Sequence, residues 1–128
     1  MYGSIDEATV WAEWSQATGG GVAPEDDPRW LCMFEADLAV VDLRRPEVRA
    51  ALGVTVEQLT ARWAPGSPNR ACLKVRAAAA AAGADAMIVP SAALAGAWNL
   101  DVLPIGFVNL RRVRRRRTVP RPPAQRPT

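Results

Sequence analysis

The stretch from Ala77 to Asn99 constrains the fold of this 128-residue chain more than any other. It opens with six consecutive alanines, Ala77 to Ala82, which favour a helix because alanine loses no side-chain entropy on ordering. Gly83 stands where the end of a helix prefers a left-handed residue. The apolar run from Ala86 to Val89 is typical of a short, fully buried strand. Since Pro90 cannot donate to a sheet ladder, we expect the strand to end there.

Ser91 directly follows this proline, at the expected rim of the sheet. The residues alone leave two interpretations open. A hydroxyl at the end of a buried strand is well placed to touch a ligand. A serine in this place can instead cap the turn that follows.

The composition excludes several classes of protein. A length of 128 residues suits one domain, and 49% apolar residues suffice for a core. No segment approaches the roughly 18 apolar residues of a membrane span, and the first residues do not resemble a signal peptide. There is no histidine, which argues against catalytic triads and zinc sites. Cys32 and Cys72 lie far apart in apolar surroundings, so we expect reduced core residues of a cytoplasmic protein.

Charge is distributed unevenly along the chain. Eight of the 16 basic residues are arginines between positions 111 and 128, and the remaining eight face 13 acidic residues. Residues 1–110 therefore carry a net charge of −5, so their folded surface should not attract nucleic acid. The segment 111–128 is rich in arginine and proline and is predicted to be a disordered tail, dispensable for folding. It is either a solubilising extension or an arm for an anionic partner.

The pattern of elements predicts an α+β fold, a small mixed sheet with helices packed against it. Helices are expected over 4–17, 46–52, 55–63 and 69–82, and strands over 30–38, 86–89 and 99–110. Residues 39–43 either extend the first strand or begin another. The first and third helices begin with apparent capping boxes, at Ser4 to Glu7 and at Thr55 to Gln58. Pro104 and Gly106 interrupt the last strand, which indicates an edge or a bulge.

Several of these pieces together resemble the RES domain, the toxin half of RES–Xre toxin–antitoxin pairs. The segment from Tyr2 to Glu13 looks like the family's tyrosine and its serine-, alanine- and glutamate-bearing helix. Residues 82–91, reading AGADAMIVPS, are similar to the family's A-G-x-D-G-x-x-V-P-S segment, with Ala86 in place of the second glycine. Trp98-Asn99-Leu100 matches the usual sequel, and the resemblance covers about residues 1–110.

The resemblance implies an ADP-ribosyltransferase-like fold with a cleft for NAD, which is a substrate rather than a cofactor. Family members cleave NAD by phosphorolysis or hydrolysis, or transfer ADP-ribose to a protein. It implies catalytic roles for Glu13 and Ser91 and substrate binding by Tyr2, Ser91 and Asn99, with no metal. In the family, an Xre-like antitoxin normally covers the cleft, and the domains often form dimers. We expect no membrane partner, and we do not favour nucleic acid as a partner.

One departure from the family matters. Family members carry an arginine and further sheet upstream of the tyrosine, whereas here the tyrosine is residue 2. We therefore expect either a reading frame that starts further upstream or an N-terminally truncated descendant. Two other functions stay open: a catalytically inactive remnant that serves as a protein-interaction module, and a nucleic-acid binder that uses its basic tail.

Overall fold

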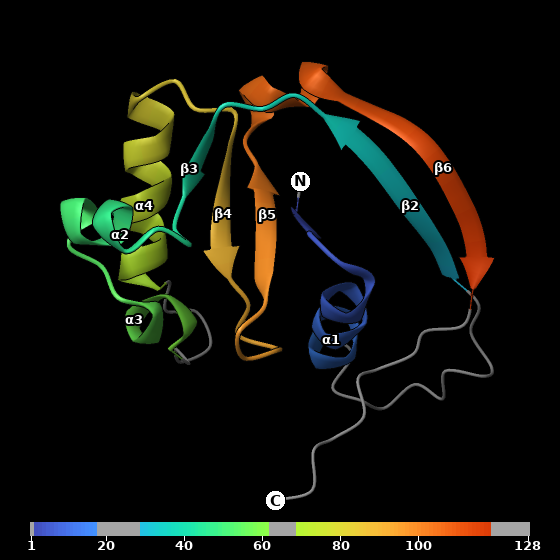
Figure 1. The fold of residues 1–128 in the computed structure, drawn as a ribbon, viewed down its shortest axis with the longest axis horizontal. Helices are drawn as coiled ribbons and strands as arrows, with labels where there is room; N and C mark the ends of the chain where they lie inside the picture. The colour runs from blue at the N-terminus through green and yellow to red at the C-terminus, as the bar shows by residue number, and fades with distance from the viewer. Residues whose placement is uncertain (1, 18–28, 62–68, 119–128) are drawn as a thin grey trace, which may run out of the picture.

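The computed structural model describes residues 2–17, 29–61 and 69–118, which form a four-stranded sheet, a separate two-stranded ribbon and flanking helices (Figure 1). The strand order of the sheet is β1-β5-β4-β3, with β3 parallel to β4 and the other pairs antiparallel. The elements along the chain are β1 (Tyr2–Ser4), α1 (Glu7–Ala17), β2 (Arg29–Ala36), β3 (Val40–Asp42), α2 (Pro46–Leu52), α3 (Val56–Thr60), α4 (Arg70–Ala81), β4 (Ala86–Pro90), β5 (Trp98–Val102), the 3₁₀ helix η2 (Pro104–Asn109) and β6 (Leu110–Thr118). The predicted α+β class with a small mixed sheet is confirmed.

Local sequence signals account for most helix ends. Pro46 occupies the start of α2, and Gly53 closes it in the left-handed conformation, with φ of 67°. Thr55 and Gln58 form the expected capping box of α3. That helix ends at Thr60 rather than near residue 63 because Ala61 is extended. Asn69 caps α4 by accepting a hydrogen bond from the Cys72 backbone N–H.

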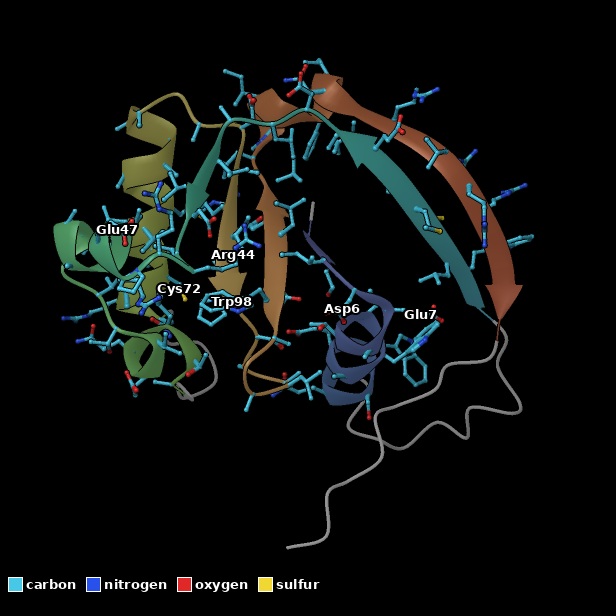
Figure 2. The ribbon with its side chains drawn as sticks, in the orientation of Figure 1. Asp6, Glu7, Arg44, Glu47, Cys72 and Trp98 are labelled. Carbon is cyan, nitrogen blue, oxygen red and sulfur yellow. The ribbon has the colours of Figure 1, made fainter. Side chains whose placement is uncertain are left out.

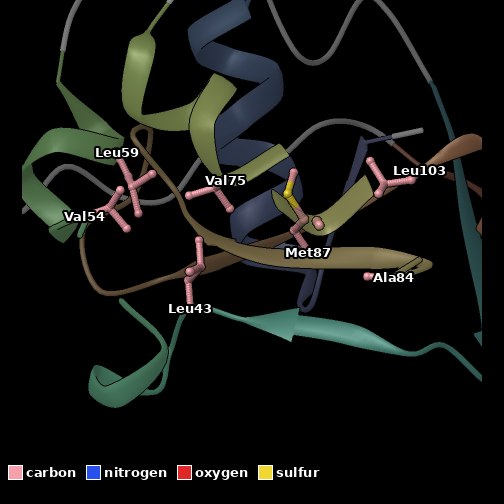
Figure 3. Close-up of a cluster of buried hydrophobic side chains, with 8 residues drawn as sticks. Leu43, Val54, Leu59, Val75, Ala84, Met87 and Leu103 are labelled. Atoms are coloured by element: carbon pink, nitrogen blue, oxygen red, sulfur yellow. The ribbon is translucent and has the colours of Figure 1, made fainter. Parts of the chain in front are cut away.

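The main hydrophobic core lies between the sheet and helices α2, α3 and α4, on the β3 side of the molecule (Figure 1). Figure 3 shows its central side chains. Among them are Leu43 just after β3, Leu59 of α3, Val75 of α4 and Met87 of β4. Leu43 and Val75 are almost fully buried, and such a side chain contributes about 1.5–3 kcal/mol by leaving water. The buried cluster comprises Leu43, Val54, Leu59, Val75, Ala79, Ala84, Met87 and Leu103.

Strand β4 is buried on both faces, as its unbroken apolar run predicts. Met87 belongs to the core cluster, while its neighbours Ala86 and Ile88 are also buried on the opposite face. The last residue pair of the β4–β5 ladder joins Pro90 to Trp98, so the strand ends where proline was expected to end it.

The two-stranded ribbon is the largest departure from expectation. Strand β6 pairs antiparallel with β2 over its whole length, from Leu110 opposite Ala36 to Thr118 opposite Arg29. The prediction of a disordered tail from residue 111 is therefore wrong for residues 111–118. These residues are ordered because β2, with its apolar run from Trp30 to Phe34, has backbone N–H and C=O groups that need hydrogen-bond partners, and β6 provides them. Residues 119–128 lie outside the described part of the chain.

Two smaller expectations are also wrong. Strand β5 is an interior strand, not an edge, because Pro104 falls after its end and begins η2 instead of interrupting a ladder. Cys32 and Cys72 are free thiols, but both residues are exposed and neither belongs to the core. None of the helices in the described ranges is long and apolar enough to cross a membrane.

Gly106 in η2 is predicted to be required for stability. A Cβ atom at this position would lie 2.4 Å from the Asp85 carbonyl oxygen, which already accepts a hydrogen bond from the Leu103 N–H. Gly106→Ala should lower the free energy of unfolding by about 1–3 kcal/mol, measured by urea denaturation. Gly3→Ala is the control, because its Cβ would meet nothing nearer than the Leu100 carbonyl oxygen at 4.0 Å. Equal stability of the two variants would contradict the proposed close approach.

Candidate active site

Glu13, Ser91 and Asn99 converge on one point although they come from different parts of the chain. Glu13 lies on α1, Ser91 directly follows β4, and Asn99 is the second residue of β5. Ser91 Oγ donates a hydrogen bond to Glu13 Oε1 at 2.7 Å, and Asn99 Nδ2 donates to the same oxygen. The expected meeting of Glu13 and Ser91, 78 positions apart, is therefore confirmed.

Ser91 caps the turn after β4, which is one of the two interpretations that the sequence left open; its contact with a ligand stays a prediction. Its hydroxyl oxygen accepts hydrogen bonds from the backbone N–H groups of Ala93 and Leu94, each at 3.1 Å, and so caps the turn after β4. The hydroxyl hydrogen is then directed to Glu13. Because Ser91 is only 4% exposed, the turn fixes the direction in which this donor points.

Asn99, in the interior strand β5, links the Glu13 carboxyl group to Ser4 of the edge strand β1. It is fully buried in β5, opposite Ser4 of β1 and Val89 of β4. Its Oδ1 accepts a hydrogen bond from Ser4 Oγ at 2.7 Å, which leaves the amide nitrogen oriented toward Glu13. Ser4, Glu13, Ser91 and Asn99 are called the Glu13 cluster below.

The start of α1 explains why Ser4 is available to the cluster. The expected capping box from Ser4 to Glu7 is wrong, because Asp6 caps the helix instead. Asp6 Oδ1 accepts from the backbone N–H and the hydroxyl of Thr9, which lowers the pKa of the Asp6 carboxyl below its ordinary value of 3.8. At a pH above 3.8, the ionised Asp6 carboxyl therefore contributes to the free energy of unfolding. This contribution is lost as the pH falls through the lowered pKa. Figure 2 labels Asp6 and Glu7 at this end of α1.

The two oxygens of Glu13 have different surroundings. Both hydrogen bonds go to Oε1, and Oε2 has no partner among the described residues. The Glu13 residue itself is half-buried. No described lysine or arginine forms an ion pair with Glu13. The carboxyl group is thus held by neutral donors through one of its two oxygens.

The structure places the remaining predicted residue, Tyr2, only by its backbone. Tyr2 pairs with Asp101 at the start of β1, two positions before Ser4. Its side chain lies outside the described part, so its predicted substrate contact stays a prediction. Among the described residues no group of three or more histidine, cysteine or acidic side chains could hold a metal ion.

A cavity of about 470 Å³ lies next to the cluster, between β1 and the ribbon. It shares Ser4 with the cluster, but Glu13, Ser91 and Asn99 do not line it. Apolar side chains such as Trp30 and Phe34 form much of its wall. Its ionisable lining groups include the carboxyl groups of Asp6 and Glu7, which would repel a pyrophosphate. The cavity is therefore a poor place for the phosphates of a dinucleotide.

Comparison with protein families adds the decisive observation. A family model described as RES domain matches residues 1–122 of the 128-residue chain. The chain belongs to the RES domain family. No curated protein and no solved structure matches it significantly. The match runs past residue 110, in agreement with the inclusion of β6 in the folded domain.

Membership of the RES domain family confirms the resemblance found in the sequence. The assignment of Glu13 and Ser91 to the family's glutamate and serine positions stays a prediction. Sequence reasoning missed Ser4 as a member of the cluster. Its pattern matched a capping box, and only the register of β1 against β5 brings its hydroxyl opposite Asn99. The sequence contains no signal for that register because β1 is only three residues long.

Proposed function

We propose that this RES domain cleaves NAD at the bond between nicotinamide and ribose, by phosphorolysis, hydrolysis or ADP-ribosyl transfer. One observation carries the proposal: Ser91 and Asn99 both donate to one oxygen of the half-buried Glu13, whose second oxygen has no partner among the described residues. Family membership supports the substrate class, since NAD is what the resemblance implies.

The arrangement suits the charge that develops in this reaction. Departure of nicotinamide builds positive charge on the ribose, as in the oxocarbenium-like transition state of glycoside hydrolysis. A fixed carboxylate without a cationic partner can stabilise that charge, and its second oxygen can orient the attacking hydroxyl, phosphate or water. Ser91 and Asn99 hold Glu13 Oε1, so reorganisation during the reaction is small.

Other properties implied by the resemblance belong to the same proposal. They are an ADP-ribosyltransferase-like fold with a cleft for NAD, and substrate contacts from Tyr2, Ser91 and Asn99. They also include a cytoplasmic location and an Xre-like antitoxin that covers the cleft. Each follows from the family rather than from a contact in the described residues.

The test is release of nicotinamide from NAD, followed by chromatography, for this chain and for any longer in-frame reading of its gene. Ser91→Ala should lower the rate about tenfold to a hundredfold, because it removes one of the two donors that orient the carboxylate. Separate reactions in water, with phosphate and with added protein would identify the acceptor. Absence of nicotinamide release from both folded proteins would overturn the proposal and favour a protein-interaction module.

A further inference from the structure

The β2–β6 ribbon carries a concentration of positive charge that the Glu13 cluster does not use. Its two strands contain seven arginines and one acidic residue, Glu35, whereas residues 1–110 as a whole carry a net charge of −5. Arg111 forms an ion pair with Glu35, and Arg112, Arg114 and Arg115 are exposed. The ribbon curves away from the four-stranded sheet (Figure 1), and its register places Arg112 and Arg115 on one face and Arg111 and Arg114 on the other.

The pairing register combines this charge with aromatic side chains. Residues directly opposite each other in an antiparallel pair point to the same face. Phe34 lies opposite Arg112 and Cys32 opposite Arg115, and strand alternation places Trp30 on that face too. Trp30 is 56% exposed and Phe34 45% exposed. The guanidinium of Arg115 lies 4.5 Å from the centre of the Trp30 ring. We call the face formed by Trp30, Phe34, Arg112 and Arg115 the stacking face.

We propose that the stacking face of the ribbon binds single-stranded nucleic acid. Exposed aromatic rings stack on unpaired bases, and neighbouring arginines neutralise the backbone phosphates. A duplex offers its phosphates to the arginines but keeps its base faces stacked internally, so the rings would gain little from it. Trp30 and Phe34 also line the adjacent cavity, whose apolar wall suits an uncharged, unpaired base. The Asp6 and Glu7 carboxyls that line the same cavity disfavour phosphates inside it, so the phosphates are left to the arginines.

An acidic peptide without aromatic residues would satisfy the arginines but not the exposed rings. Carboxylate side chains pair with guanidinium groups, yet they present no flat aromatic partner to Trp30 and Phe34. The negative charge of the rest of the domain restricts polyanions to the ribbon. Nucleic acid therefore accounts for both the arginines and the exposed rings, whereas carboxylate side chains alone account only for the arginines.

The experiment measures fluorescence anisotropy of labelled short oligothymidylate, oligouridylate and a duplex of equal length, with the full-length protein over a salt titration. Binding of the single strands should be saturable, tighter than that of the duplex, and weaker at high salt. Arg112→Ala with Arg115→Ala should make the slope of log affinity against log salt concentration shallower by about 1.4, or roughly 0.7 for each lost phosphate contact. Arg70→Ala with Lys74→Ala, which removes the same charge from the exposed side of α4, should leave the slope unchanged.

The aromatic contribution is tested separately. Trp30→Ala should weaken single-strand binding at least about fivefold and leave duplex binding nearly unchanged, because it removes a stacking ring and no charge. Trp30→Phe keeps a ring and should retain most of the affinity, which also controls for a loss of ribbon structure. The proposal is overturned if the single strands do not bind, if the α4 double variant loses as much affinity as the ribbon variant, or if polyglutamate binds more tightly than the oligonucleotides.

Discussion

Glu13→Gln is expected to reduce nicotinamide release by about 10²–10³-fold or more while the domain stays folded. Glutamine preserves the shape of the side chain and an oxygen that can accept from Ser91 and Asn99, so the hydrogen bonds of the cluster can be retained. It removes the negative charge that would face a cationic ribose, and losing a single preorganised electrostatic contact in other enzymes has effects of this size. The loss should appear in kcat rather than in KM, because the charge matters most in the transition state.

A matched variant separates this effect from a general change in charge. Glu57→Gln makes the same chemical substitution at an exposed position of α3, away from the cluster. It should retain the wild-type rate, and circular dichroism should show the same thermal midpoint for both variants within a few degrees. Wild-type turnover by a folded Glu13→Gln protein would remove Glu13 from the mechanism and leave the cluster a purely structural contact.

Deleting β6 is expected to unfold β2 as well. A chain that ends after Asn109 loses the whole ladder that pairs residues 29–36 with 110–118. The remaining strand would present Trp30, Met33 and Phe34 to water without backbone partners, and such a strand has no independent stability. The core cluster draws its residues from β4, the helices and neighbouring segments rather than from the ribbon, so the four-stranded sheet should persist.

Hydrogen exchange measured on two truncated chains tests this directly. The amides of β2 that bond to β6 should lose most of their protection in the chain ending after Asn109, whereas amides of β4 should keep theirs. A chain ending after Thr118 keeps both strands and serves as the control, with protection in β2 close to that of the full-length protein. Unchanged β2 protection in the shorter chain would show that the ribbon pairing is not what orders this strand.

Short-range signals in the sequence predicted the elements around the core. Pro46 with Gly53, the Thr55 capping box and the alanine helix before Gly83 each depend on interactions within a few residues of the chain. They succeed because the backbone groups they satisfy belong to the same helix or turn. The candidate site was predicted differently, from the resemblance of Glu13 and Ser91 to family positions, and the structure brings their side chains into contact.

Features that depend on long-range pairing could not be predicted. The arginines of residues 111–117 indicate disorder when the segment is taken alone, and only the apolar strand β2, about eighty positions earlier, gives them a ladder. The hydrogen bond between Ser4 and Asn99 likewise spans 95 positions and depends on which strand lies beside β5. Local propensity contains no information about such partners.

The hydrogen bonds of Glu13 also bear on how relatives of this domain should be compared. Because Ser91 and Asn99 both donate to Glu13 Oε1, the side chain fastens α1 to the end of β4 and to β5 in addition to any chemical role. Selection for folding alone would therefore retain an acceptor here after activity had been lost. A glutamate at this alignment position in a distant homologue is thus weak evidence of catalysis. A glutamine there would indicate a domain that retains the two hydrogen bonds between α1 and the sheet but lacks the negative charge.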